Sequence, residues 1–424
     1  MLIGIDIAQI SRFENIGEAF IKKCFNEDEI ALFTGVKAAE RIAANFAAKE
    51  AFAKALGTGV RGFELRDISV LRDNLGKPYF KFADNVSAIL LRLGAKKVEL
   101  TLSHDGGMAI AAVAIECSDK VKNFSFLIDK TRTDDKNIIS YKTVKSSILP
   151  RESNTHKGDY GKIFIVAGSK GLTGAAIMAS KAALKSGGGL ITLGCPDSLN
   201  SIFEISLHEV MTYPLADNGI YLLKDCAGDI IEKANKSSVL AFGCGLSNTK
   251  DVRSILKRVL HEVEVPVVID ADGLNALSRN INILKTAKPP VVLTPHIAEF
   301  ARLSGYAVED INADREKFAK EFAVKWGVTL VLKSEKTLVA DEYGNIYANL
   351  LGNAGMATGG SGDVLAGIIA SFIGQGIENA VQCGVYIHSL AGDMAAQDKG
   401  EYGMTPADII ENIPYAIDLI CGKD

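Results

Sequence analysis

Apolar runs bounded by glycine alternate with helical stretches from about residue 162 onward, and this alternation restricts the possible folds more than any other feature. The strand-length runs are residues 163–167, 190–193, 239–242, 265–269 and 291–293. The helical stretches include residues 175–185, 252–260, 362–373 and 378–397. Apolar strands that alternate with helices are typical of a parallel sheet covered on both faces. We therefore expect an α/β fold here, with a parallel-rich sheet between two layers of helices.

The first 117 residues have a different pattern. A strand-length run at residues 2–7 precedes an alanine-rich helical stretch at residues 38–56, which stops at Gly57. Further strand-length runs follow at residues 68–71, 79–82, 98–103 and 108–115. A helical stretch begins after Asp84. The pattern predicts a small α+β domain.

A segment rich in charged residues separates these two regions, at residues 116–137. With 424 residues the chain exceeds the ~100 to 200 residues of a usual single domain, so two cores are expected. We predict a small domain at residues 1–117, a linker at residues 118–139 and a large domain at residues 140–424.

Composition excludes several classes of protein. Hydrophobic residues make up 48% and charged residues 23%, which is ordinary for a globular protein and not for a disordered or fibrous one. The net charge of -4 predicts no nucleic-acid partner. The seven cysteines show no CxxC, disulfide-like or zinc-like spacing, which is typical of a reducing compartment. The sequence shows no signal peptide and no apolar run of ~20 residues, so we expect a cytoplasmic protein without membrane contact.

A glycine-rich loop at residues 353–362 stands directly before an apolar helical stretch. Glycines allow successive backbone N–H groups to point inward, and a helix N-terminus adds partial positive charge, so the loop is suited to bind an anion. Asp363 follows in the first helical turn. It is either a functional carboxylate or a simple favourable charge at the start of a helix, and the spacing leaves both open.

The run NAGMATGGSGDVLAG at residues 353–367 resembles the ribokinase-like superfamily and its GxGD motif. More narrowly, it resembles the NAD(P)HX dehydratase family, whose usual form is NPGMATGGTGDVLAG. Other runs match that family in the same order: HKGDYGKIFIVAGS, LTGAA, GCGL, VIDADGLNAL, LTPHIAEFARL, VLKSEKT and GEYGMTPADII. The resemblance covers about residues 140–424. One departure is that the family's GPGLG appears as GCGLS at residues 243–247.

The resemblance implies an enzyme that dehydrates NADHX and NADPHX, the hydrated forms of NADH and NADPH. ADP or ATP would be the co-substrate, and phosphate would be released with AMP or ADP. Asp363 would be the catalytic base. Gly360 and Gly362 would hold the transferred phosphate through their backbone donors.

The family also implies binding residues at several strand ends. Nucleotide binding would involve Lys333, Ser334, Glu335, Lys336 and Thr337. The hydrated dinucleotide would contact Ala176, Gly245, His296 and Asp363. Taken alone, Lys333 is typical of an exposed lysine at a strand end and His296 of a structural histidine. Asp270 and Asp272 follow another strand, where ligands gather in open α/β sheets, but Asp270 could equally cap a helix.

Two carboxylates in the first domain suit magnesium. Asp6 ends a short strand and Glu50 lies in the alanine-rich helix, and Mg²⁺ takes hard oxygen ligands that it shares with phosphates. From spacing alone, Glu50 and Lys54 could instead form a simple helix salt pair.

The runs GIDI, FAAKEAFAKALGTG and LSHDGGMAIAAVAIE resemble the holo-acyl-carrier-protein synthase family over residues 1–117. By this resemblance Asp6 and Glu50 hold magnesium on coenzyme A, with Lys54, Ser103 and His104 near the phosphate. The enzyme would transfer 4′-phosphopantetheine from coenzyme A to a serine of acyl carrier protein. Many members have an arginine where this chain has Asn45, and Arg41 could compensate.

Two alternatives remain open at this point. The larger domain could be a sugar or vitamin kinase of the same superfamily, since the phosphate loop alone does not separate stable phosphorylation from phosphorylation followed by elimination. The smaller domain could be a non-catalytic oligomerisation module. Both families imply a homo-oligomer, and we find no epimerase segment in the sequence.

Overall fold

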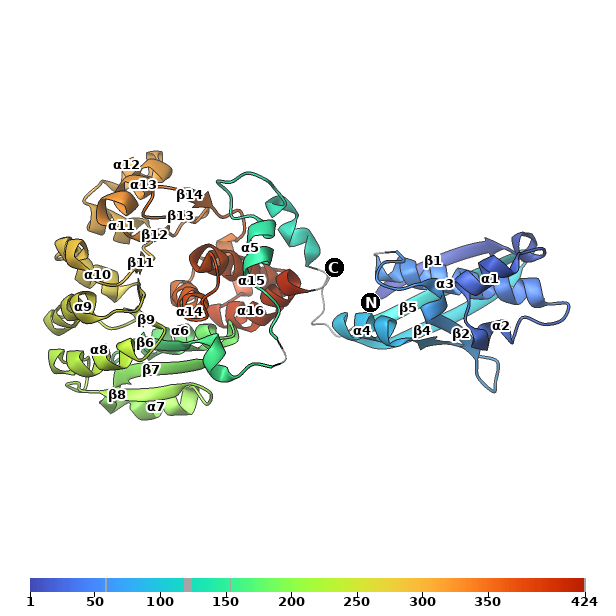
Figure 1. The fold of residues 1–424 in the computed structure, drawn as a ribbon, viewed down its shortest axis with the longest axis horizontal. Coiled ribbons are helices and arrows are strands. Elements are labelled where there is room, and N and C mark those ends of the chain that lie inside the picture. Colours follow the sequence, from blue (N-terminus) through green and yellow to red (C-terminus); the bar gives the residue numbers. More distant parts are fainter. Residues whose placement is uncertain (58, 118–123, 153, 423–424) are drawn as a thin grey trace. The chain divides into compact units, whose positions relative to one another are not determined.

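The computed structural model describes residues 1–57, 59–117, 124–152 and 154–422, and they form two compact units that divide between residues 123 and 124 (Figure 1). Each unit has its own hydrophobic core. Among the described residues, none of the helices combines the length and the apolar character needed to span a bilayer.

The smaller unit is built on an antiparallel sheet packed against one long helix, α3 (Ala38–Leu56). The strands lie in the order β1 (Leu2–Gln9), β5 (Met108–Cys117) and β4 (Ala95–Asp105). A separate hairpin pairs β2 (Ile68–Arg72) with β3 (Pro78–Phe82). The remaining α-helices are α1 (Glu18–Cys24), α2 (Glu27–Ile30) and α4 (Asp84–Arg92). The predicted α+β domain is confirmed.

Small side chains explain how closely α3 approaches the sheet. A Cβ atom at Gly4 of β1 would lie 2.0 Å from the carbonyl oxygen of Ala51 in α3, so only glycine fits there. The alanines of α3 are buried against the sheet, and the helix ends at Gly57, whose φ of 73° is left-handed.

The opposite face of this sheet carries apolar side chains that the described residues leave uncovered. Ile3, Ile5 and Ile7 on β1 are 59%, 59% and 54% exposed, and Ile110, which pairs with Ile7, is 41% exposed. Side chains alternate across a strand, so these residues share one face while Gly4 and Ala8 face α3. We call Ile3, Ile5, Ile7 and Ile110 the isoleucine face.

The larger unit contains a twisted sheet, to which nine strands contribute within the described part of residues 124–422. Their order is β14 (Ile346–Ala348), β13 (Leu338–Ala340), β12 (Thr329–Leu332), β11 (Val291–Leu293), β10 (Val267–Ile269), β9 (Val239–Phe242), β6 (Lys162–Val166), β7 (Leu190–Pro196) and β8 (Met211–Leu215). From β8 to β12 the neighbours are parallel, whereas β13 and β14 add antiparallel strands at one edge. The predicted parallel-rich sheet is confirmed.

Helices cover both faces of this sheet, as expected. One face packs on α5 (Tyr141–Ser147), α6 (Thr173–Lys185), α7 (Asn200–Ser206), α14 (Ser361–Gly374), α15 (Ala380–Gly403) and α16 (Pro406–Cys421). The other packs on α8 (Ala227–Asn235), α9 (Lys250–Glu262), α10 (Asp272–Ser278), α11 (Ile297–Ser304), α12 (Val308–Ala313) and α13 (Arg315–Trp326). Successive strand residues supply the two cores in turn: Ile163 enters the first and Phe164 the second.

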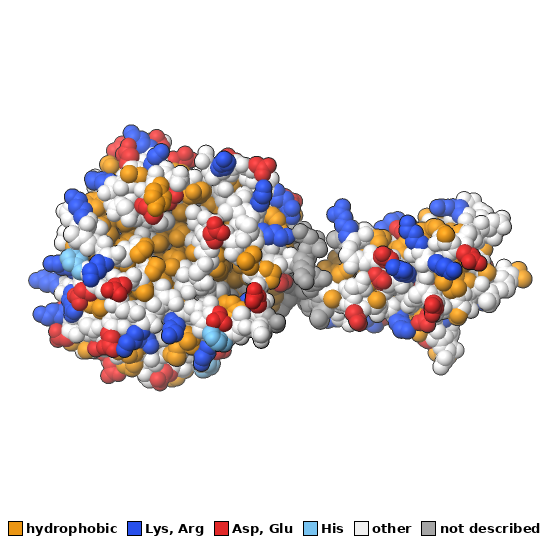
Figure 2. Space-filling view, in the orientation of Figure 1, with side chains coloured by type: hydrophobic (Ala, Val, Ile, Leu, Met, Phe, Trp, Pro, Cys, Tyr) orange, Lys and Arg blue, Asp and Glu red, His pale blue; other side chains and the backbone are white. Residues whose placement is uncertain are grey.

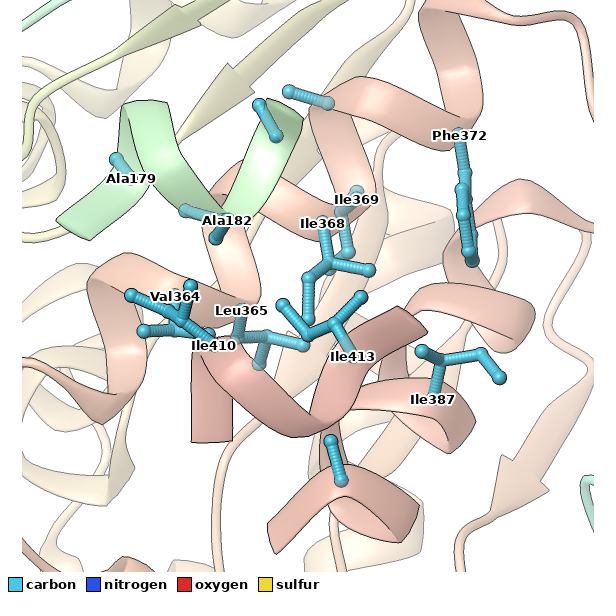
Figure 3. Packing of buried hydrophobic residues seen from close by; sticks show 14 of the residues in the cluster. Ala179, Ala182, Val364, Leu365, Ile368, Ile369, Phe372, Ile387, Ile410 and Ile413 are labelled. Carbon is cyan, nitrogen blue, oxygen red and sulfur yellow. The ribbon is translucent and has the colours of Figure 1, made fainter. Parts of the chain in front are cut away.

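The central helix α14 packs tightly in the first core. Figure 3 shows Val364, Leu365 and Ile368 of α14 between α6 and α16. A Cβ atom at Gly367 would lie 2.2 Å from the carbonyl oxygen of Ala179, so α14 and α6 meet backbone to backbone. This packing fixes the position of the first turn of α14.

The predicted linker at residues 118–139 includes residues 118–123, which lie outside the described residues. The rest of it, from Phe124, packs on the larger unit: Phe124, Ile128 and Ile139 belong to the first core. The buried hydroxyl of Thr131 lies 2.8 Å from that of Tyr386 in α15. The charged residues between these positions made the segment resemble a linker, but Phe124, Ile128 and Ile139 are buried, while Phe126 remains 55% exposed.

Candidate active site

A pocket of about 960 Å³ opens at the carboxyl ends of β10, β11 and β12, beside the start of α14. In Figure 2, apolar side chains gather in the middle of the visible face of this unit and charged ones lie mostly around them. The pocket is lined by Asp270, Ala271, His296, Lys333, Ser334, Glu335, Thr337, Leu351, Gly352, Asn353, Ala354, Met356, Ala357, Thr358, Gly360, Ser361, Gly362, Asp363, Leu365, His388 and Ser389.

Two glycines at the start of α14 leave room for their neighbours. Gly360 precedes the helix with a left-handed φ of 104°, and a Cβ atom there would lie 2.4 Å from Cε of Met178. A Cβ atom at Gly362 would lie 3.0 Å from Nζ of Lys333. The helix N-terminus and the lysine ammonium group therefore face the same small volume, which suits a phosphate group.

Asp363 lies in the first turn of α14, next to these glycines. Burial raises the pKa of this carboxyl to about 6, and the nearby carboxylate of Asp270 contributes to the rise, while the Cys244 thiol and Lys333 act in the opposite direction. A base works best when its pKa lies near the working pH, so the environment adjusts Asp363 toward accepting a proton.

Lys333 forms a buried ion pair with Asp270. The Nζ atom lies 2.8 Å from Oδ1 of Asp270, whose side chain is 3% exposed. Burial alone would lower the pKa of Lys333, but the charges of Asp270 and Glu299 outweigh it and raise the pKa. Cys244, Asp270 and Asp363 bring possible metal ligands within 4.8 Å of one another, but Lys333 already supplies a positive charge there.

His296 caps a helix and also lies in the pocket wall. It caps α11, because its Nδ1 atom accepts a hydrogen bond from the backbone N–H of Ala298 at 3.1 Å. An isolated parallel bridge pairs it with Lys333, and its half-exposed side chain lines the pocket. The cap orients the ring through Nδ1, and Nε2 lies 3.6 Å from Oε2 of Glu299.

Four of the five candidate nucleotide residues line the pocket, and Lys336 does not. The segment is a compact turn, since the Ser334 hydroxyl donates to the carbonyl oxygen of Lys336 at 2.8 Å. Glu335 pairs with Arg315 at 2.6 Å. The turn therefore presents Lys333, Ser334 and Thr337 to the pocket.

Ala176 and Gly245 lie outside the lining of this pocket. Ala176 is fully buried in α6, and a Cβ atom at Gly245 would lie 3.1 Å from Cβ of Ala175. Both residues are therefore near the start of α6, beside the loop that follows β9.

The loop at residues 243–247, where GCGLS departs from the family's GPGLG, is held by hydrogen bonds. Ser247, which replaces the family's last glycine, has a left-handed φ of 67°. Its hydroxyl lies 2.8 Å from that of Ser169, and Asp272 accepts its backbone N–H at 2.8 Å. Asp272 thus holds the loop that follows β9 and is not part of the pocket lining.

Sequence reasoning missed a set of polar residues on the pocket side of α15. His388 and Ser389 line the pocket, and burial lowers the pKa of His388 to about 4, so its ring is neutral. Asp393, one turn further on, hydrogen-bonds to Gly352 and Asn353. The available signal was the presence of these polar residues in an otherwise apolar helical stretch.

In the smaller unit the structure brings Asp6, Glu50 and Lys54 together. Lys54 Nζ lies 2.8 Å from Oδ1 of Asp6. Burial raises the pKa of Glu50, and the charge of Asp6 raises it further. Two carboxylates this close favour a cation, so the donor set fits Mg²⁺.

Ser103 and His104 lie two strands away from Asp6 in the same sheet. Asp6 pairs with Ala111 of β5, which pairs with Leu102 of β4. His104 lies 3.2 Å from Glu40 of α3, a different carboxylate from the Asp6–Glu50 pair.

Asn45 belongs to a buried network and not to the surface. Its side chain donates to Glu29 at 3.0 Å and accepts from Arg72 at 3.2 Å, and Glu29 also pairs with Lys49 at 2.6 Å. Arg41 donates to the carbonyl oxygen of Leu32 at 2.9 Å. Arg41 thus contacts the segment that follows α2, and Arg72 is the arginine beside Asn45.

Comparison with known families gives one match for each unit. Residues 163–415 match the model of the NAD(P)H-hydrate dehydratase family. Residues 2–113 match that of the 4′-phosphopantetheinyl transferase superfamily.

Several relatives resemble the larger unit. A bifunctional NAD(P)H-hydrate repair enzyme from Moorella thermoacetica is 41% identical over 64% of this chain and 52% of its own length. An ADP-dependent (S)-NAD(P)H-hydrate dehydratase from Neisseria meningitidis is 37% identical over 59% of this chain and 82% of its own length. The chain spans about half the length of the bifunctional relatives it matches.

A solved structure has the same fold as the larger unit. It is the ADP/ATP-dependent NAD(P)H-hydrate dehydratase from Bacillus subtilis, co-crystallised with ATP and Mg²⁺. It is 27% identical, has a TM-score of 0.58, and the match covers 67% of this chain and 98% of that one.

Proposed function

The chain belongs to the NAD(P)H-hydrate dehydratase family, and on that premise we propose that its larger unit converts NADHX and NADPHX back to NADH and NADPH. ADP or ATP is the co-substrate, and the products include phosphate with AMP or ADP. The position of Asp363 carries the proposal: a carboxyl with a pKa near 6 lies in the first turn of α14, beside Gly362 and Lys333.

The chemistry needs one base and one phosphate site. Asp363 takes the proton from the hydroxyl that hydration added to the ring, while that oxygen attacks the terminal phosphorus of the nucleotide and AMP or ADP leaves. The resulting phosphate ester then loses phosphate, and the neighbouring carbon loses a proton, so the ring double bond re-forms. The backbone N–H groups around Gly360 and Gly362, together with Lys333, hold the phosphate during both steps.

We also propose binding roles for the residues in and around the pocket. Ser334 and Thr337 would hold the nucleotide on the β12 side of the pocket, and Lys333 its phosphates. His296 would contact the hydrated ring through Nε2. Ala176 and Gly245 would contact the remote half of the dinucleotide near the start of α6, outside the pocket that holds Asp363.

A direct assay separates this proposal from a kinase. We expect the protein, incubated with hydrated NADH and ADP, to restore the absorbance of the reduced nicotinamide ring. A small-molecule kinase would instead accumulate a stable phosphorylated product. Absence of recovery with both ADP and ATP would refute the dehydratase function.

For the smaller unit we propose transfer of 4′-phosphopantetheine from coenzyme A to a serine of acyl carrier protein. The match of residues 2–113 and the gathering of Asp6, Glu50 and Lys54 support this function over a non-catalytic module. Asp6 and Glu50 would hold Mg²⁺, which neutralises the pyrophosphate of coenzyme A when bound. Lys54 would support the same phosphates, with Ser103 and His104 further along the sheet.

The isoleucine face supports a homo-oligomer. Four isoleucines, Ile3, Ile5, Ile7 and Ile110, are each more than 40% exposed on one sheet face. Such a patch is typical of a subunit interface. We expect Ile5→Glu to dissociate the oligomer in light scattering, whereas Val36→Glu, a change at a fully exposed position away from the sheet, would leave it intact. A wild-type protein that is monomeric would refute this arrangement.

A further inference from the structure

Helix α15 places three polar side chains beside the pocket: His388, Ser389 and Asp393. They are only 7%, 5% and 8% exposed. Burial of a polar group costs free energy unless the group is hydrogen-bonded. The hydrogen-bond partners of these three residues therefore indicate which segment of the chain α15 holds in place.

Asp393 binds the loop that precedes the glycines of α14. Its Oδ2 accepts a hydrogen bond from the backbone N–H of Gly352 at 3.0 Å, and its Oδ1 accepts one from Nδ2 of Asn353 at 2.9 Å. The Oδ1 atom of Asn353 in turn accepts the N–H of Gly355 at 3.0 Å. One carboxylate thus fixes the loop at Gly352 and Asn353 directly and at Gly355 through Asn353.

The other two side chains hold the segments on either side. Ser389 accepts a hydrogen bond from Asn349 at 2.9 Å, and Nε2 of His388 lies 3.3 Å from the hydroxyl of Ser361. Gly352 has a φ of 110°, a conformation that other residues rarely adopt, so the chain needs such contacts to keep this path. The segment from Asn349 to Ser361 is therefore hydrogen-bonded to α15 at its start, near its middle and at its end.

We propose that Asp393 is a positioning residue that presets residues 352–355 for the phosphates of the nucleotide. Among the described residues, Asp393 is not part of the pocket lining, whereas Gly352 and Asn353 are, so it acts through them. The role in nucleotide binding rests on the proposed function. The role in ordering the loop does not.

Exchange of the two interacting side chains tests the proposal. Asp393→Asn alone loses a hydrogen bond. Its new NH2 group must face either the backbone N–H of Gly352 or the NH2 group of Asn353, and both of these are donors. Asn353→Asp alone places two carboxylates against each other. The double variant restores every contact, since the new amide at position 393 can donate to the new carboxylate at position 353 and accept from Gly352, while that carboxylate accepts from Gly355. Asp229→Asn, at an exposed site on α8, is the matched control.

Two measurements are compared, amide hydrogen exchange of residues 352–358 without ligand and the Kd for ADP. We expect each single variant to speed the exchange and to weaken ADP binding about tenfold, the effect of losing a hydrogen bond to a charged group. The double variant should return the exchange, though not the Kd, to near the wild-type value, because its new carboxylate at position 353 lines the pocket and repels the phosphates of ADP. Asp229→Asn should change neither.

The outcomes decide separately on the two proposals. Unchanged exchange in Asp393→Asn, or a double variant whose exchange is as fast as that of the single variants, overturns the positioning role. Wild-type protein that binds no ADP overturns the nucleotide site, and the exchange data still decide whether Asp393 orders the loop. If a single variant does not fold, Asn353→Ala replaces it, and it should release Gly355 while keeping the contact with Gly352.

Discussion

The Nζ atom of Lys333 lies 2.8 Å from Oδ1 of Asp270, and this pair holds a positive charge next to the first turn of α14. The two residues come from the carboxyl ends of β12 and β10. Lys333 therefore lines the pocket and also neutralises a buried carboxylate.

Because Lys333 neutralises Asp270, its removal should lower the stability of the protein. Lys333→Met should lower the free energy of unfolding by about 3 kcal/mol, because it leaves Asp270 buried without a partner. Adding Asp270→Asn should recover most of the stability but not the turnover. Urea unfolding of both variants checks this, and equal loss in the single and double variants would contradict it.

Asp363→Asn should lose most of its turnover. The amide is nearly the same shape but accepts no proton, so we expect a fall of about 10² to 10⁴ in kcat, the usual contribution of a base. ADP should still bind with similar affinity, as calorimetry would show. A variant that keeps its turnover would contradict the role of Asp363.

The pKa of Asp363, raised to about 6, predicts the acid side of the pH profile. The base acts only when ionised, so kcat should fall as the pH drops through about 6. Cys244 opposes this raised pKa, so Cys244→Ala should move the fall to higher pH. A profile that is flat down to pH values near ~4, the ordinary range of an aspartate, would contradict the assignment.

The same shift has a consequence for stability. The folded-state pKa lies above the ordinary value of 3.8, so the ionised carboxylate is disfavoured in the folded protein. This destabilisation is absent below pH 3.8, grows between 3.8 and about 6, and is complete above it. Relative to the wild type, Asp363→Asn should therefore gain in melting temperature as the pH rises across this range, as calorimetry at several pH values would test.

Asp6→Ala should abolish phosphopantetheine transfer in the smaller unit and leave dehydration unchanged. The variant removes one of the two carboxylates that fit Mg²⁺ and the partner of Lys54. Transfer of labelled phosphopantetheine to acyl carrier protein measures the loss, and chelation of Mg²⁺ should reproduce it in the wild type. Equal inactivity of wild type and variant would favour a non-catalytic module.

Regular patterns in the sequence predicted most of the fold. The strands from β6 to β11 are largely apolar, with glycine at several of their ends, and the helices have the length that parallel crossovers need. The edge strands β8 and β14 and the neighbouring β13 were not predicted. β8 contains Pro214 and is largely accessible, and β14 is only half-buried, so neither has the continuous apolar character of the central strands. The packing of Phe124, Ile128 and Ile139 on the larger unit was missed because the charged residues around them obscured these few apolar positions.

The candidate site was predictable only where chemistry is local in sequence. Gly360, Gly362 and Asp363 are so close in the chain that the sequence alone indicates the shared role that we propose for them. The contacts of Asp393 with Gly352 and Asn353 join residues about 40 positions apart, and no spacing rule reveals them. Asn45 shows the converse, since its partner Glu29 lies in another element and turns its side chain away from the surface.

The segment from Phe124 to Ile139 adds a practical consequence. Phe124, Ile128 and Ile139 fill part of the first core, and Thr131 is bonded to Tyr386 on the helix that carries Asp393. A protein shortened to start at residue 140 would lose this support and expose apolar surface. Genetic separation of the two units, by truncation or by recombination, must therefore divide the chain ahead of Phe124 if the larger unit is to remain folded.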